Sequence, residues 1–165
     1  MARTSRTKAS RDDDAIDFGE VPPAVNEILQ RGVALWRTDR VAADAAFREA
    51  LALDPRALAT WFCLYKIHTY SGDLDAALVA AEGGAREAAR QANLAPDWRD
   101  WDAEAISFDG PGRFALYTLK ALAFIRLRRD EPDEARAALD ALARLDPDDA
   151  VGGSVVEAIW RGTAG

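Results

Sequence analysis

The sequence predicts an all-α fold built from paired helices, on three observations. A nine-residue pattern occurs twice, at 47–55 (FREALALDP) and at 139–147 (LDALARLDP). A turn followed by an alanine-bearing helix start occurs three times, at 39–43 (DRVAA), 72–78 (GDLDAAL) and 130–135 (DEPDEA). The third observation is an apolar stripe at helical spacing, formed by Ala135, Ala138, Leu139, Leu142 and Leu145. Repeated helical pairs of this kind bury one continuous core by stacking on their neighbours.

Turn signals and apolar stripes divide the chain into seven expected helices. Pro22, Pro23 and Pro132 stand where proline is tolerated, in a first helical turn. Pro55 and Pro147 each follow an aspartate and stop a helix, because proline disfavours the helical conformation of the residue before it. The expected helices lie near residues 22–38, 41–53, 57–70, 74–93, 113–129, 132–145 and 149–161.

Two segments fall outside this pattern. Residues 1–18 are polar and lack periodic apolar positions, which predicts a disordered tail before a domain at 19–162. Residues 95–112 form an insertion that closes with the helix-breaking run GPG at 110–112, a hinge-like approach to the next helix. Trp98, Trp101 and Phe108 make the insertion too aromatic for an idle linker, so it either packs on the helices or contacts a ligand.

The repeated pattern resembles the tetratricopeptide repeat (TPR), in which small residues stand where paired helices touch and a proline follows the second helix. Ala43 and Ala77 are 34 residues apart, the period of that family, and Ala135 follows after one period plus a 24-residue insertion. The resemblance implies a short solenoid of three helical hairpins plus a C-terminal capping helix. Tyr65 and Ala81 depart from the family pattern, which prefers a small residue and a bulky aromatic residue there.

The C-terminal helix is expected to cover the last hairpin, because an uncapped solenoid exposes an apolar face. Its apolar positions form one expected stripe: Val151, Val155, Val156, Ile159 and Trp160.

Composition excludes several classes of protein. A formal charge of -7 argues against binding along a nucleic-acid backbone, and no apolar run approaches the roughly 20 residues of a membrane span. The basic residues at the start are followed by Asp12, Asp13 and Asp14 in place of an apolar segment, so no secretory signal is expected. With the single cysteine, Cys63, these features predict a cytoplasmic protein that binds neither membrane nor nucleic acid.

No constellation of residues predicts catalysis, a metal or a cofactor. His68 is the only histidine, and Cys63 lies five residues away on the same expected helix, about 140° around its axis. The acidic runs at 12–14 and 146–149 suit solvation and helix capping better than metal binding. Gly83 and Gly84 indicate a close helix contact, since no Lys-Ser/Thr pair follows them to make a phosphate loop.

The TPR resemblance also implies a binding surface, because the first helix of each repeat lines a groove in that family. The matching positions mix aromatic rings with cations, the residue types that dominate binding hot spots. The expected partner-binding residues are Trp36, Arg37, Phe62, Lys66, Tyr70, Tyr117, Lys120, Phe124 and Arg128. The alternative is that several of these side chains only pack against neighbouring helices.

The sequence therefore predicts an adaptor or assembly factor that holds another protein or peptide and is not an enzyme. Residues 63–66 (CLYK) and 113–128 (RFALYTLKALAFIRLR) also look similar to small stand-alone bacterial TPR proteins associated with nitrogen-fixation gene regions. That resemblance implies a helper of a metalloenzyme system. The alternative is a self-associating structural module, in which homo-oligomers form through helix faces.

Overall fold

The chain is all-α in the computed structural model, which describes residues 20–164. Seven helices and two short 3-10 turns make up this part of the chain, with no strand among residues 20–164. They are α1 (Pro23–Leu35), α2 (Arg40–Leu53), α3 (Leu58–Ser71), α4 (Leu74–Gln91), η1 (Trp98–Asp100), η2 (Ala103–Ala105), α5 (Gly110–Arg128), α6 (Pro132–Leu145) and α7 (Gly153–Ala164). The tail predicted at 1–18 lies outside the described residues.

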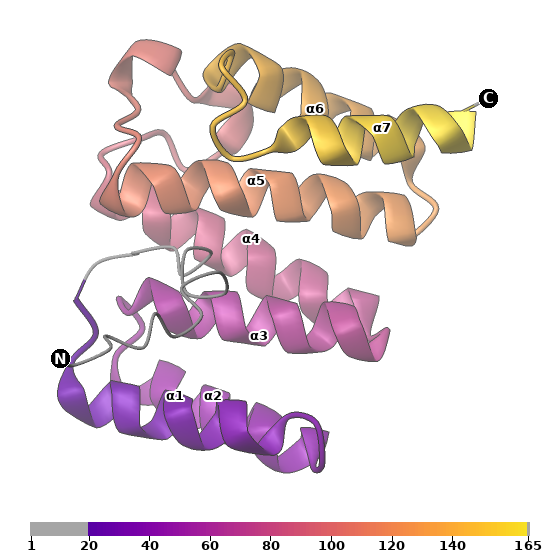
Figure 1. Cartoon of the computed structure of the whole chain (residues 1–165). Coiled ribbons are helices and arrows are strands. Elements are labelled where there is room, and N and C mark those ends of the chain that lie inside the picture. The colour runs from indigo at the N-terminus through magenta and orange to yellow at the C-terminus, as the bar shows by residue number, and fades with distance from the viewer. Residues whose placement is uncertain (1–19, 165) are drawn as a thin grey trace, which may run out of the picture.

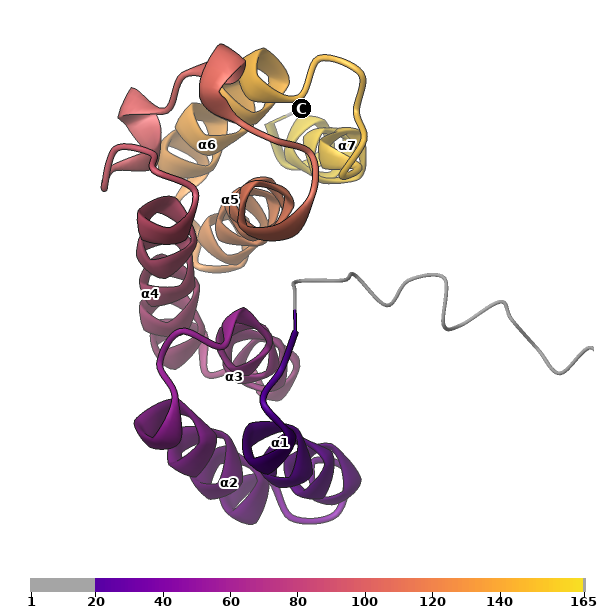
Figure 2. The same cartoon turned by 90° about the vertical axis from the view of Figure 1, so that its left-hand side faces the viewer.

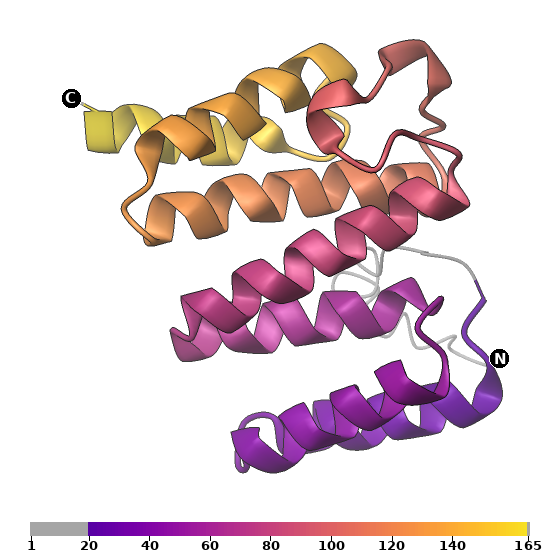
Figure 3. The same ribbon diagram turned by 180° about the vertical axis from the view of Figure 1, so that it is seen from behind.

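The helices stack as consecutive pairs in two layers. Figure 1 shows α1 with α2, α3 with α4, and α5 with α6 rising one above another, with α7 beside α5 and α6. Viewed along the helices, α1, α3, α5 and α7 form one layer and α2, α4 and α6 the other (Figure 2). The layer of α2, α4 and α6 is the one nearer the viewer in Figure 3. In Figure 2, α1 and α7 project further than α3 and α5, so the first layer is concave.

Local signals start and stop the helices of each pair. The Asp39 carboxylate accepts a hydrogen bond from the Ala42 amide at 3.0 Å, and Asp73 accepts one from Ala76 at 3.2 Å. Each bond satisfies a backbone donor that has no partner inside the helix. Gly72 ends α3 with φ of 80°, a left-handed conformation that costs glycine nothing.

Four helix ends lie three or four residues from their expected positions, including the end of α7 at Ala164. Helix α1 ends at Leu35, three residues before the expected end, and α5 begins at Gly110, so the GPG run forms its first turn. Pro111 fits there because the first turn of a helix needs no amide donor from that position. Helix α7 begins only at Gly153, since the Asp146 carboxylate holds the preceding loop by accepting bonds from the amides of Ala150 and Val151 at 2.9 and 3.0 Å.

Small residues let the two layers approach closely. A Cβ atom at Gly32 on α1 would overlap the ring of Phe47 on α2, and one at Gly83 on α4 would overlap the ring of Trp61 on α3. The Trp61 indole also donates to the Pro55 carbonyl at 2.9 Å, which fixes the ring over α4. The predicted role of Gly83 in close helix contact is confirmed.

The insertion folds back onto the helices through Trp101. Its side chain is 2% exposed, and its indole donates to the Ala95 carbonyl at 2.8 Å. Arg144 on α6 donates to the Trp101 carbonyl at 2.8 Å and ties the insertion to that helix. Trp98 is half-buried, whereas Phe108 remains exposed. Trp101 therefore packs on the helices, which is one of the two alternatives that the sequence left open for the insertion.

Helix α7 divides its apolar residues between two surroundings. Val156 is buried, and the Trp160 indole donates to the Pro132 carbonyl at the start of α6 at 3.1 Å. Val155 and Ile159 are exposed at 60% and 41%. The expectation that all five apolar positions form one covering stripe was wrong, because the helix lies against α5 and α6 along only one of its sides.

Candidate functional site

The concave layer carries a groove made of two adjoining pockets, which we call the groove pockets. The first, of about 300 Å³, lies between α1 and α3, with Phe47 of α2 at its base. The second, of about 240 Å³, lies between α3, α5 and α7. Lys66 and Tyr70 of α3 line both pockets, so the groove crosses the layer from α1 to α7.

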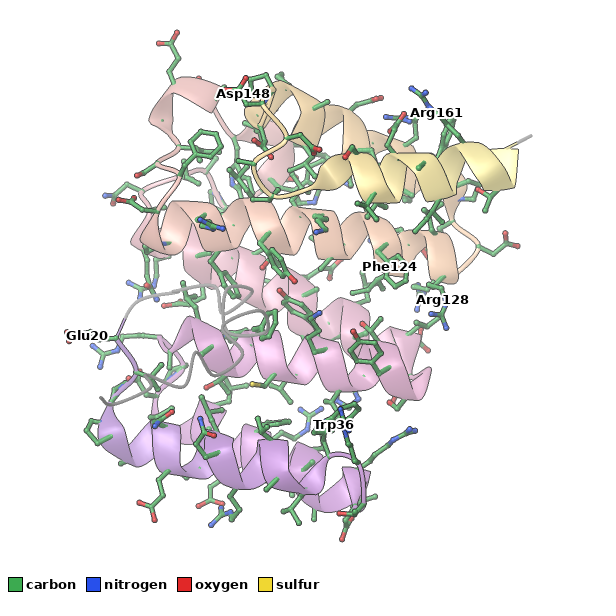
Figure 4. All side chains as sticks on the ribbon, in the orientation of Figure 1. Glu20, Trp36, Phe124, Arg128, Asp148 and Arg161 are labelled. Carbon is green, nitrogen blue, oxygen red and sulfur yellow. The ribbon has the colours of Figure 1, made fainter. Side chains whose placement is uncertain are left out.

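The structure brings all nine predicted partner-binding residues to this layer. Seven of them line the groove pockets: Trp36, Phe62, Lys66, Tyr70, Tyr117, Lys120 and Phe124. Arg37 and Arg128 stand at the end of the groove where Trp36 and Phe124 lie (Figure 4). The first helix of every pair lies in the same layer, which is why residues far apart in the sequence meet here.

Aromatic side chains form contacts from helix to helix along the groove. The ring centroids of Trp36 on α1 and Tyr70 on α3 are 6.0 Å apart. Phe62 on α3 lies 5.8 Å from Tyr117 on α5 and 5.5 Å from the buried Tyr65. Aromatic pairs at these separations are attractive beyond their buried area, so the groove wall has a defined shape.

Each cation of the groove lies over an aromatic ring. The Arg37 guanidinium is 5.2 Å from the Trp36 ring, and Arg128 is 5.8 Å from Phe124. The Lys66 ammonium lies 5.3 Å from the Phe62 ring and 5.5 Å from the Tyr70 ring. Lys120 is 5.2 Å from the Tyr117 ring and also donates to the Val151 carbonyl at 2.9 Å. The rings hold these cations beside the pockets while leaving them charged.

Carboxylates of the described residues do not reach the groove lining. Among residues 20–164, no aspartate or glutamate lines the two groove pockets. Within residues 20–164, no carboxylate oxygen lies within 4.0 Å of the charged groups of Arg37, Lys66 or Arg128. The groove is thus apolar and basic in a protein whose formal charge is -7.

Three exposed apolar residues also belong to the groove, of which the TPR resemblance places Val33 on the groove wall, whereas Val155 and Ile159 were not expected there. Val33 lines the first groove pocket, and Val155 and Ile159 line the second. Their exposed fractions are 48%, 60% and 41%. The spacing of Val155 and Ile159, four residues apart, places them on one side of α7, but the sequence does not say which side faces the core.

A second hollow, of about 330 Å³ between α6 and α7, has a different character. Its arginine, Arg136, lies 2.8 Å from Glu157, and its Asp149 accepts a bond from the Ser154 amide at 3.0 Å. The charges in this hollow are already matched within the chain. We therefore place the candidate site at the groove pockets.

Cys63 and His68 do not meet. Cys63 lines the first groove pocket, where burial raises the pKa of its thiol to about 11. His68 is buried on the side of α3 that faces α2, with Nε2 at 2.8 Å from Asp44 Oδ1. The histidine therefore links two helices and does not activate the thiol.

No group of three or more histidine, cysteine, aspartate or glutamate side chains is placed to hold a metal ion anywhere in residues 20–164. In the same part of the chain, no helix combines the length and the apolarity needed to cross a membrane.

The chain matches no protein-family model, and a search of curated proteins finds no match either.

Proposed function

We propose that this protein is a TPR-like adaptor or assembly factor that binds a segment of another protein in the groove pockets. The observation that carries the proposal is the combination of exposed apolar side chains with cations held over rings, in a lining to which residues 20–164 contribute no carboxylate. Such a surface fits an extended segment or a helix that has both apolar and acidic side chains. No catalytic residue and no cofactor is part of this proposal.

The energetics favour occupancy of the groove by a ligand. Tyr70, Val155 and Ile159 leave apolar area in contact with water, and covering it contributes about 25 cal/mol per Å². An aromatic anchor at the centre of an interface contributes about 2 kcal/mol or more. Pre-positioned rings lower the entropy that is lost on binding, because Trp36 already contacts Tyr70 and Phe62 already contacts Tyr117.

The test is a double variant, Tyr117→Ala with Phe124→Ala. Both side chains are half-buried in the second groove pocket, two helical turns apart on α5. We expect the affinity-tagged double variant to lose capture of partners from the native cell while its circular dichroism spectrum at the capture temperature remains that of a folded helical protein. Its melting temperature should fall, because both rings pack partly against the core. A folded variant that captures the same proteins in the same amounts would remove the groove as the binding site.

Self-association is the second candidate, and the exposure of Val155 and Ile159 beside Tyr70 favours it specifically. Sedimentation of the pure protein over a range of concentrations distinguishes the two functions. A protein that is monomeric at all concentrations supports the adaptor. A wild-type dimer that the double variant fails to form supports the structural module. The role beside a bacterial metalloenzyme system stays a prediction from the resemblance to proteins of nitrogen-fixation gene regions.

A further inference from the structure

The charge of the groove is opposite to the charge of the chain that carries it. Arg37, Lys66, Lys120 and Arg128 gather at the groove while the whole chain has a formal charge of -7. Because no carboxylate among residues 20–164 lines the groove pockets, an acidic ligand meets attraction along the groove. Apolar side chains in the same ligand would pack against the aromatic rings of the groove lining.

The chain itself contains a segment of this composition. Residues 12–18 (DDDAIDF) carry four aspartates together with Ile16 and Phe18. The residues before them are basic, with Arg3, Arg6, Lys8 and Arg11, so the acidic and apolar character is confined to 12–18. We infer that residues 12–18 are a ligand of the groove pockets in the same chain, an inference that rests on the proposed function.

The attachment point of this segment makes the contact geometrically available. The described chain starts at Glu20, immediately before α1, at the end of that helix opposite Trp36 (Figure 4). Asp14 is six residues from Glu20, and an extended chain spans at most about 20 Å over that distance. Lys66 and Lys120 lie about halfway along α3 and α5, so the acidic residues can reach the middle of the groove.

Because the segment is covalently attached to the chain that carries the groove, even a weak interaction keeps the groove mostly occupied. A ligand joined by a short connection has an effective concentration on the order of 1 mM. With a dissociation constant of about 0.1 mM, the segment would occupy the groove about nine-tenths of the time. A partner would then bind about tenfold more weakly to the wild-type chain than to a chain whose segment cannot compete. A partner must therefore bind the groove strongly enough to displace the segment.

Three full-length proteins test this arrangement, with a fluorescein-labelled peptide of residues 9–20 as the probe. The first is the wild type. The second, which we call the neutral-segment variant, has the substitutions Asp12→Asn, Asp13→Asn, Asp14→Asn, Ile16→Ser, Asp17→Asn and Phe18→Ser. The third adds Lys66→Glu and Arg128→Glu to the neutral-segment variant, which reverses charges that have no carboxylate partner in residues 20–164. Circular dichroism checks that all three melt alike.

The expected result in fluorescence anisotropy is peptide binding to the neutral-segment variant that is about tenfold tighter than to the wild type. The third protein should bind the peptide at least tenfold more weakly than the second, and added salt should weaken binding to the second. Equal affinity of the first two proteins would overturn the inference, as would no binding to the neutral-segment variant.

Two further outcomes separate related explanations. A wild-type affinity that falls as protein concentration rises would place the segment in the groove of a second copy, which contradicts occupancy within one chain. Failure of the proposed function is detected separately, by the capture experiment with Tyr117→Ala and Phe124→Ala. If that capture is groove-dependent while the peptide affinities of the first two proteins are equal, the groove binds partners and only the self-occupancy is wrong.

Discussion

Cations in the groove differ in their neighbours from the cations elsewhere on the molecule that form ion pairs. On α2, the Arg48 guanidinium lies 2.9 Å from Asp44, and where α5 ends, Arg126 lies 2.6 Å from Glu131. In the groove, by contrast, Lys66 faces the rings of Phe62 and Tyr70. Two arginines outside the groove also lie over rings, Arg99 over Trp98 and Arg136 over Trp160, but both hold carboxylates as well.

This difference separates cations that are paired with carboxylates of the fold from cations that lie over aromatic rings. Exposed ion pairs contribute about 1 kcal/mol or less, and those outside the groove neutralise charge within the chain. Cations over rings keep their charge available to an outside anion, because an aromatic ring supplies no formal negative charge. Variants in the groove and variants outside it should therefore differ in their effects on binding and on stability.

The largest effect is expected at the contact between the two layers. Trp61→Ala should lower the free energy of unfolding by about 3 kcal/mol, because the ring packs over Gly83 and Gly84 and its indole bond to Pro55 is lost. Tyr70→Ala is the matched groove variant, and its ring is 66% exposed. We expect it to change stability by less than about 1 kcal/mol in urea unfolding. Equal losses would mean that the groove rings are part of the core.

Cys63 tests the burial of the groove wall. Burial raises its pKa to about 11 from an ordinary value of 9.0, so the thiolate fraction at pH 8 is about a hundredfold lower than in a free thiol. Alkylation of the folded protein at pH 8, followed by mass spectrometry, should be slower by about that factor. A rate equal to that in urea would show that the pocket between α1 and α3 is open to the reagent.

Neighbouring residues of α7 allow a direct comparison of its two sides. Trp160→Ala should cost about 2 kcal/mol, less than a fully buried tryptophan, because the ring is half-buried against α6 and Arg136. Ile159→Ala removes a side chain that faces the groove and should leave thermal unfolding nearly unchanged. A midpoint that Trp160→Ala does not move would show that α7 is not docked on α6.

The smallest expected effect is on the stability of the fold in acid. Hydrogen bonds from Arg126 and Arg129 hold the pKa of Glu131 below its ordinary value of 4.5. A lowered pKa in the folded state stabilises the fold above about pH 4.5, and this stabilisation is lost as pH falls through the lowered value. Glu131→Gln should therefore reduce the acid dependence of the melting temperature by an amount worth less than about 1 kcal/mol. An unchanged dependence between pH 5 and pH 3 would contradict this.

The repeated pattern, the turn signals and the proline positions were enough to predict seven helices, and an apolar stripe supported α6. The TPR resemblance predicted that residues such as Trp36, Tyr70 and Phe124 face one groove, and they share a layer because alternate helices of the stacked series lie on the same side. The sequence pattern did not predict which side of α7 packs against α5 and α6. Val155 and Val156 are equally apolar, and only packing against α5 and α6 leaves the first exposed and buries the second.

Loop conformation was also beyond the sequence pattern. The carboxylate of Asp146 delays the start of α7 by binding two loop amides, a contact that depends on the position of the whole loop. In the insertion, Trp101 is buried and Phe108 is exposed, although both are aromatic residues of one short segment. Tertiary contacts such as the Arg144 bond to the Trp101 carbonyl decide between them.

The most direct test of the groove as the binding site removes equal numbers of exposed apolar side chains from the two layers. One variant carries Tyr70→Ser and Ile159→Ser in the groove, where the exposed fractions are 66% and 41%. Its match carries Val41→Ser and Val79→Ser on α2 and α4, where they are 83% and 68%. With both variants folded by circular dichroism, quantitative capture from the native cell should fall at least tenfold for the groove variant and stay at the wild-type level for its match. Equal capture by the two variants would contradict the assignment of binding to the groove.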